Sequence, residues 1–154
     1  ETLIDTGEFE SIQVPFSLAN PSAAFPVTPD FTEFNHGGII NYATENGLFT
    51  FAIRVFAGGA LLGKQPSAYT FKTPFFPLDL YERDTERAKQ IRERLAGTGT
   101  SVDMSQLAIR SVLDTPTLDS AIIGLGDLTH VANATQAVNS EPLDSELLNR
   151  IMCV

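Results

Sequence analysis

The chain has 154 residues, of which 43% are hydrophobic and 19% charged, a composition typical of one folded domain. Its formal net charge of −9 argues against nucleic acid as a partner, because phosphate binding needs clustered Lys and Arg and the ten basic residues are spread along the chain. No apolar run approaches the roughly eighteen residues that cross a bilayer, so no membrane partner is expected. The lone cysteine, Cys153, cannot form an internal disulfide, which favours a reducing compartment and a cytoplasmic location.

The first half of the chain predicts a strand, a helix and a second strand. Residues 10–17 form a short β-rich run, and the three prolines within residues 18–30 indicate a loop. Residues 37–47 have apolar side chains at helical spacing and end on Gly47, a typical left-handed helix stop. Residues 49–55 are apolar almost throughout, which is typical of a parallel strand covered on both faces.

The second half begins with residues 65–84, whose three prolines and five aromatic residues predict an ordered but irregular excursion. Residues 84–97 have helical composition and end on Gly97. A helix, a short buried strand and two more helices are then expected at 101–116, 119–124, 127–140 and 143–152. The expected helix caps are Asp84, Asp127 and Asp144. This alternation predicts right-handed βαβ units and a parallel sheet.

Four segments follow one another in the order, and at about the spacing, of one enzyme family. They are SIQVPFSLANP, NYATENGLFTFAIRVFAGGALLGK, SQLAIRSVLDTPTLDSAIIGL and DLTHVANATQAV. Together they resemble the C-terminal part of an aldo-keto reductase, from about its sixth barrel strand onward. The resemblance implies an α/β fold, the C-terminal portion of a (β/α)8 TIM barrel, with residues 1–154 as a single partial-barrel segment. It also implies an oxidoreductase that interconverts carbonyls and alcohols with NAD or NADP.

By this resemblance the chain carries most of the cofactor side of the site. Gln13 matches the glutamine at the end of the sixth strand that contacts the nicotinamide amide, although it could also be an ordinary polar residue at a strand end. The pyrophosphate would lie over the glycine-rich turn at residues 54–59, where main-chain N–H groups would approach its oxygens. The helix start at residue 127 would offer further free N–H groups. The expected cofactor residues are Gln13, Arg54, Val55, Phe56, Gly58, Gly59, Gly124, Gly126, Asp127, His130 and Asn133.

Departures from the family pattern bear on cofactor choice. Ile53 stands where an aromatic ring often stacks on the nicotinamide. Arg54 replaces a serine, and could meet a phosphate or a substrate carboxylate, or form a structural ion pair. Leu125 and His130 stand where members that prefer NADPH carry basic residues, and Asp127 would face a 2′-phosphate, which favours NAD or a relaxed preference. Asp127 could equally be only a helix cap, and His130 only a surface residue.

Family members carry out the reaction with Asp, Tyr, Lys and His on their first four strands, and no residue of this chain matches those positions. The tyrosines and histidines are Tyr42, Tyr69, Tyr81, His36 and His130, none in a matching context. We therefore expect no catalytic residue, and an inactive chain unless a partner completes the barrel. That partner would be the missing N-terminal barrel half or a second copy of the chain. The alternative is a non-catalytic remnant or partner-binding module that uses a nucleotide-binding half-barrel surface.

Three smaller expectations complete the sequence-based description. The aromatic segment 70–81 could form a substrate-side loop or pack against the barrel exterior. Lys64, at the end of the glycine turn, is expected to be solvated rather than a ligand. The two histidines and the cysteine are not clustered, so no metal site is expected.

Overall fold

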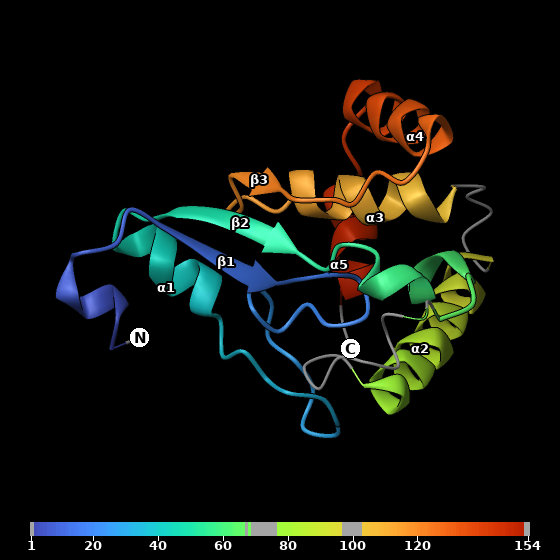
Figure 1. Ribbon diagram of the computed structural model, residues 1–154. Helices are drawn as coiled ribbons and strands as arrows, with labels where there is room; N and C mark the ends of the chain where they lie inside the picture. Colours follow the sequence, from blue (N-terminus) through green and yellow to red (C-terminus); the bar gives the residue numbers. More distant parts are fainter. Residues whose placement is uncertain (1, 67, 69–76, 97–102, 153–154) are drawn as a thin grey trace.

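A computed structural model describes residues 2–66, 68, 77–96 and 103–152. Three parallel strands form a sheet in the order β1-β2-β3, with helices packed on one side of it and beyond its ends (Figure 1). The elements are η1 (Ile4–Thr6), β1 (Ser11–Pro15), α1 (Ile39–Glu45), β2 (Phe49–Ile53), the 3-10 segment η2 (Ala57–Leu62), α2 (Leu78–Ala96), α3 (Met104–Leu113), β3 (Ser120–Ala121), α4 (Leu128–Asn139) and α5 (Ser145–Met152). The predicted alternation of parallel strands and helices is confirmed.

The third strand is shorter than the sequence predicted, since only Ser120 and Ala121 pair with β2. A side chain supplements this short ladder. The carboxylate of Asp119 accepts the main-chain N–H of Thr50 at 2.8 Å, and the Thr50 hydroxyl lies 2.9 Å from the same oxygen. Thr50 is completely buried and Asp119 is exposed, so these hydrogen bonds join β2 to the residue before β3 at the boundary of the core.

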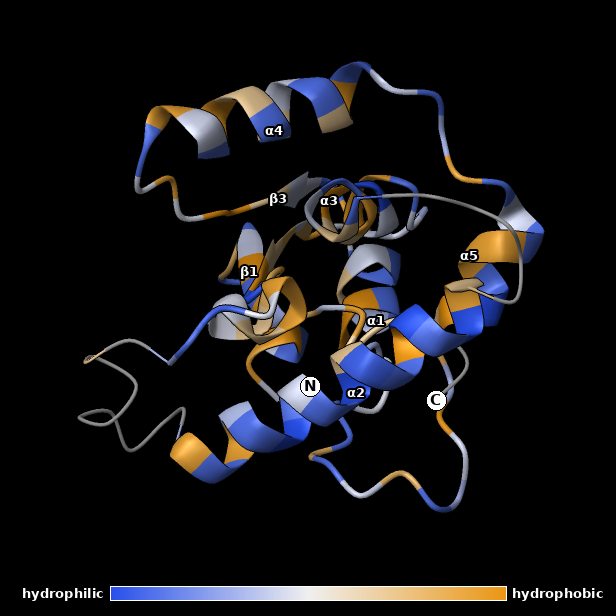
Figure 2. Cartoon of the chain, turned by 90° about the vertical axis from the view of Figure 1, so that its right-hand side faces the viewer, coloured by the Kyte–Doolittle hydropathy of each residue, from blue (hydrophilic) through white to orange (hydrophobic). Residues whose placement is uncertain are grey.

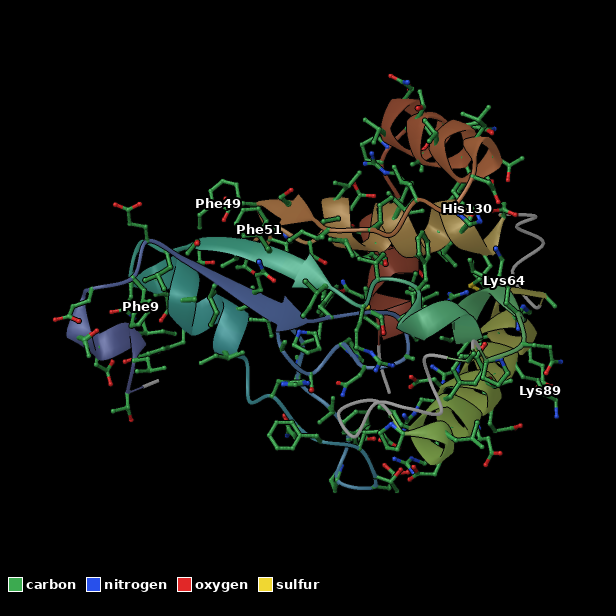
Figure 3. The ribbon with its side chains drawn as sticks, viewed as in Figure 1. Phe9, Phe49, Phe51, Lys64, Lys89 and His130 are labelled. Carbon is green, nitrogen blue, oxygen red and sulfur yellow. The ribbon has the colours of Figure 1, made fainter. Side chains whose placement is uncertain are left out.

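The sheet is covered on one face only among the described residues. Thr50 and Ala52 are fully buried, whereas the alternating side chain of Phe49 is 46% exposed and Phe51 is half-buried. The rings of Phe49 and Phe51 lie side by side, 4.8 Å apart, on the side of the sheet away from α1 (Figure 3). The prediction of a strand covered on both faces was therefore wrong, because three strands do not close a barrel and leave the inner face open.

The core lies on the other face, where strand and helix side chains meet. Figure 2 shows hydrophobic residues gathered around the sheet and α3, while α2 is hydrophilic along most of its length. The largest fully buried core side chains are Phe16, Leu18, Ile40, Leu61, Ile91, Leu107, Ile151 and Met152. Four helices and η2 thus share one core with β1 and β2.

The helix starts agree with the sequence in two of three cases. The Asp127 side chain accepts hydrogen bonds from the N–H groups of Thr129 and His130, and Asp144 accepts one from Glu146, so both predicted caps are confirmed. Asp84 is not a cap, because α2 begins at Leu78 and places Asp84 within the helix. The predicted stop Gly97 lies outside the described residues. No helix in the described parts of the chain is both long and apolar enough to cross a membrane.

Candidate functional site

The chain leaves β2 through a turn with unusual backbone angles. The predicted strand over residues 49–55 ends at Ile53, because Arg54 takes a left-handed conformation with φ of 61°. Ala57 also has a positive φ, of 50°, and Gly58 and Gly59 follow with φ of 68° and 103°. Two glycines are needed here, since residues with a Cβ rarely adopt such angles. The glycine-rich sequence therefore encodes a compact turn at the C-terminal end of β2, where parallel α/β folds place their ligands.

This turn faces the segment that follows β3. Between them lies a cavity of about 350 Å³, here called the turn pocket. Its lining residues are Arg54, Val55, Phe56, Gly58, Gly59, Leu62, Lys64, Ile122, Ile123, Gly124 and His130. Seven of them are among the eleven cofactor residues expected from the sequence. The C-terminal ends of β2 and β3 thus bring together two glycine segments that are far apart in the chain.

A second cavity of about 350 Å³, the helix pocket, adjoins the turn pocket at the N-terminal ends of α3 and α4. The two cavities share Phe56, Leu62, Lys64, Gly124 and His130. Asp127 and Asn133, also expected in the cofactor site, line the helix pocket, as does the α3 cap Asp103. Each cavity has the volume of a small-molecule site, for which about 300 to 1,000 Å³ is usual.

Lys64 and His130 meet where the two cavities join. The Lys64 Nζ atom lies 2.9 Å from the His130 Nε2 atom, and Figure 3 shows the two side chains reaching toward each other from different elements. The other ring nitrogen of His130, Nδ1, accepts the N–H of Gly126 at 3.0 Å. The His130 Nε2 atom also lies 3.5 Å from Asp127 Oδ2. An ammonium, an imidazole and a carboxylate therefore meet at the junction of the two cavities.

Several main-chain N–H groups that we expected to be available for phosphate are engaged within the fold. In the turn, the N–H of Ala57 donates to the Arg54 carbonyl at 2.7 Å, and that of Gly59 donates to the Phe56 carbonyl at 2.9 Å. At the start of α4, the Asp127 carboxylate takes the N–H groups of Thr129 and His130. The expectation of free amides is wrong at these positions, whereas the side chains of Lys64 and His130 line both cavities.

Arg54 forms an ion pair, which was one of the alternatives left open by the sequence. Its Nη2 donates to Asp84 Oδ2 of α2 at 2.9 Å, and the side chains are 17% and 5% exposed. Burial raises the pKa of Asp84 to about 6, against the opposing effect of Arg54 and Arg87. Arg87 and Arg83 in turn bind Glu33, which fixes the loop before α1 onto α2. The ion pair thus fixes the Arg54 side chain to α2, and Arg54 also lines the turn pocket.

Two predicted features lie apart from these cavities or only partly within the described residues. Gln13 is in the middle of β1 rather than at its end, exposed on the open face of the sheet and paired with Phe51. It lines neither the turn pocket nor the helix pocket. Of the aromatic segment 70–81, positions 70–76 lie outside the described residues, and Tyr81 is buried in α2 with its ring against Gly58.

Lys64 is exposed, as the sequence predicted. The sequence did not predict that it lines both cavities and contacts His130. Its position directly after Gly63, at the end of a glycine turn, was the available signal, because a left-handed glycine there turns the chain back along the site. Within the described residues no group of His, Cys, Asp and Glu could hold a metal ion.

Comparison with known proteins identifies the fold. No protein-family model matches the chain, and no curated protein matches its sequence. Among solved structures, the holo and apo forms of aldo-keto reductase AKR11C1 from Bacillus halodurans each match with a TM-score of 0.65 at 19% sequence identity. The match covers 97% of this chain and 44% of theirs, so the chain spans less than half the length of that reductase. The chain therefore has the α/β fold of part of an aldo-keto reductase barrel, with an open three-stranded sheet, as the resemblance predicted.

Proposed function

We propose that residues 1–154 form one partial-barrel segment that binds a nicotinamide dinucleotide and contributes the cofactor side of an aldo-keto reductase-type oxidoreductase. The observation that carries the proposal is the convergence of Gly58, Gly59, Lys64, Gly124 and His130 on the turn pocket. A dinucleotide needs an extended cleft with room for its charged bridge, and two adjoining cavities with glycine walls supply that shape.

The residues present fit the phosphates of such a cofactor. Lys64 and His130 lie 2.9 Å apart at the junction of the cavities, where the Lys64 ammonium could donate to a phosphate oxygen on the side away from Asp127. Added side-chain atoms at Gly124 would meet nothing within 4 Å, which leaves open space beside these side chains. Gln13, on the open face of the sheet, is proposed to orient the nicotinamide amide from inside a completed barrel. When bound, the nicotinamide supplies the hydride that reduces a carbonyl.

We infer that NAD is preferred over NADP. Asp127 lines the helix pocket, and a hydrogen bond from the Thr129 side chain is the main cause of its lowered pKa, so the carboxylate is ionised at neutral pH. A 2′-phosphate beside it would meet like charge, and Leu125, also in the lining, offers no compensating donor. A ribose hydroxyl, in contrast, can donate to this carboxylate.

Replacing Lys64 tests the phosphate assignment. Lys64→Met should raise the Kd of NADH about tenfold or more in a fluorescence titration, because one charged hydrogen bond contributes roughly 1.5 to 3 kcal/mol. Lys89→Met is the matched control, since Lys89 is an exposed lysine of α2 that points away from the cavities (Figure 3). Equal affinities for the two variants would contradict the proposal.

The proposed partner is the part of the barrel that this chain does not supply. Asp, Tyr, Lys and His for the chemical step would come from that part, in the same gene product or in another chain, and we propose a cytoplasmic setting for the assembly. The described tyrosines support this division, because Tyr81 is buried against the glycine turn and Tyr42 donates to Asp5 at the opposite end of the sheet.

A second candidate function is a non-catalytic module that binds a partner through its sheet. The half-exposed Phe49 and Phe51 on the open face favour it. Reading the gene upstream of Glu1 separates the candidates. An upstream segment with an Asp-Tyr-Lys-His set on four βα units supports the reductase, whereas an upstream segment without that set supports the binding module.

A further inference from the structure

Helix α2 lies beneath the glycine turn and contacts it along three helical turns. The residues of α2 that face the turn are Tyr81, Asp84, Ala88, Ile91 and Arg92, of which the first four are buried. From Tyr81 to Arg92 is a span of about 16 Å at the rise of an α-helix. Three of these residues, Tyr81, Asp84 and Arg92, make polar contacts with the segment from residue 54 to residue 64.

Tyr81 holds the middle and the exit of the turn. Its hydroxyl donates to the main-chain carbonyl of Lys64 at 2.5 Å, and its ring lies 3.9 Å from where a Cβ on Gly58 would be. The hydroxyl is also 3.7 Å from the corresponding point on Gly59. Because the Lys64 backbone is fixed in this way, the start of its side chain toward His130 is fixed as well.

The other contacts hold the two ends. Asp84 binds the guanidinium of Arg54, the residue whose left-handed conformation begins the turn. Arg92 donates from Nη2 to the carbonyl of Leu61 at 2.6 Å, and the same nitrogen lies 3.7 Å from the Cβ position of Gly63. Three side chains of one helix thus fix the beginning, middle and end of a segment that glycine alone would leave free.

We propose that Tyr81, Asp84 and Arg92 are positioning residues for the cofactor, which hold the glycine turn and Lys64 in the conformation that binds phosphate. This inference rests on the proposed function and goes beyond it, since none of these residues lines the junction where Lys64 meets His130. Their effect on a ligand is indirect and acts through the backbone of the turn. A turn already ordered before binding needs less ordering when the ligand arrives.

The test compares two substitutions that each remove one tyrosine hydroxyl. Tyr81→Phe should raise the Kd of NADH about five- to tenfold at a temperature where the protein is fully folded. Tyr42→Phe removes the hydroxyl that donates to Asp5, far from the turn, and should leave the Kd unchanged. Arg92→Gln should weaken NADH binding and Arg92→Lys should restore most of it, because a lysine can still donate to the Leu61 carbonyl.

A purely structural role predicts a different pattern, in which thermal midpoints fall but the Kd of the folded variants equals that of the wild type. That result would overturn the inference.

Amide NMR signals of Gly58, Gly59 and Gly63 give a readout independent of ligand, and they should shift in Tyr81→Phe and not in Tyr42→Phe. If the wild-type chain ignores NADH while these signals shift as stated, the proposed function fails and the clamping of the turn stands. If the wild type binds NADH and Tyr81→Phe binds it equally well, the clamping role fails and the proposed function stands.

Discussion

At the scale of single residues, the sequence predicted which segments lie together better than it predicted their hydrogen bonds. Ten of the eleven expected cofactor residues line the two cavities or, in the case of Gly126, bond to His130 there. Their grouping was implied by the resemblance to aldo-keto reductases, and it agrees with the rule that loops at the C-terminal ends of parallel strands lie at one edge of a sheet. The contact between Lys64 and His130 was not predicted, because the two residues are 66 positions apart and no local pattern reports it.

The buried ion pair gives a prediction for the pH dependence of stability. The pKa of Asp84 is about 6 in the folded chain against an ordinary 3.8, so the folded state binds this proton more tightly. The free energy of unfolding should therefore fall as pH rises from about 4 to about 6, by on the order of 3 kcal/mol at about 1.4 kcal/mol per pKa unit. The charged groups around Asp84 are Arg54, Arg83, Arg87 and Glu33, which remain in the variant.

Asp84→Asn replaces the titrating carboxyl group with an amide that does not titrate and keeps the shape of the side chain. In urea unfolding at pH 4 and pH 7, the free energy of unfolding of the wild type should fall relative to that of Asp84→Asn as pH rises. A constant difference between the two proteins over this range would mean that Asp84 titrates near its ordinary value.

At the scale of elements, the helices were predicted more reliably than their boundaries. The apolar spacing gave α3 and α4 within a few residues, and Asp127 was recognised as a cap from its position alone. The sequence placed the start of α2 six residues too late, at Asp84, because aspartate is a common helix cap. In the structure, Asp84 lies within the helix and its side chain binds Arg54, which is 30 positions earlier. A buried carboxylate inside a helix is stabilised by tertiary contacts, and sequence periodicity does not contain them.

The cap of α4 provides a prediction about cofactor choice. Asp127→Ser keeps a side-chain acceptor for the helix and removes the charge, so helix stability should change little while the preference for NADH over NADPH falls about five- to tenfold. Parallel titrations with the two cofactors measure the ratio of their Kd values. Asp144→Ser removes the same charge from the start of α5 and should leave the ratio unchanged. A ratio that moves equally in both variants would refute the role of Asp127.

At the scale of the whole molecule, the sequence predicted that the sheet has open edges, but it did not predict that one face of the sheet is uncovered. Three expected strands already implied unclosed edges, whereas the continuous apolar run of β2 suggested two covered faces. In this chain the run reflects a barrel strand, whose inner face is filled by side chains from the other strands. Phe49, Phe51 and Ile122 are therefore apolar and at least partly exposed for the same reason.

This face predicts how the isolated chain behaves. The 154-residue chain should self-associate in sedimentation velocity and show no carbonyl reduction. The double variant Phe49→Thr/Phe51→Thr should shift the chain toward the monomer, because it removes the two neighbouring rings and keeps residues that favour strands. Phe34→Thr is the control, since Phe34 is 75% exposed but lies in the loop before α1. A wild-type chain that stays monomeric, or that reduces a carbonyl, would contradict this description.

The hydrogen bonds between Asp119 and Thr50 have a consequence for strand alignment. With two paired residues, the backbone of β3 distinguishes poorly between neighbouring registers. A slip of two residues would keep every side chain on its own face, but it would carry the carboxylate about 7 Å away from the threonine. One acidic side chain thus selects the correct offset, and with it the distance between the two glycine segments that any ligand must bridge.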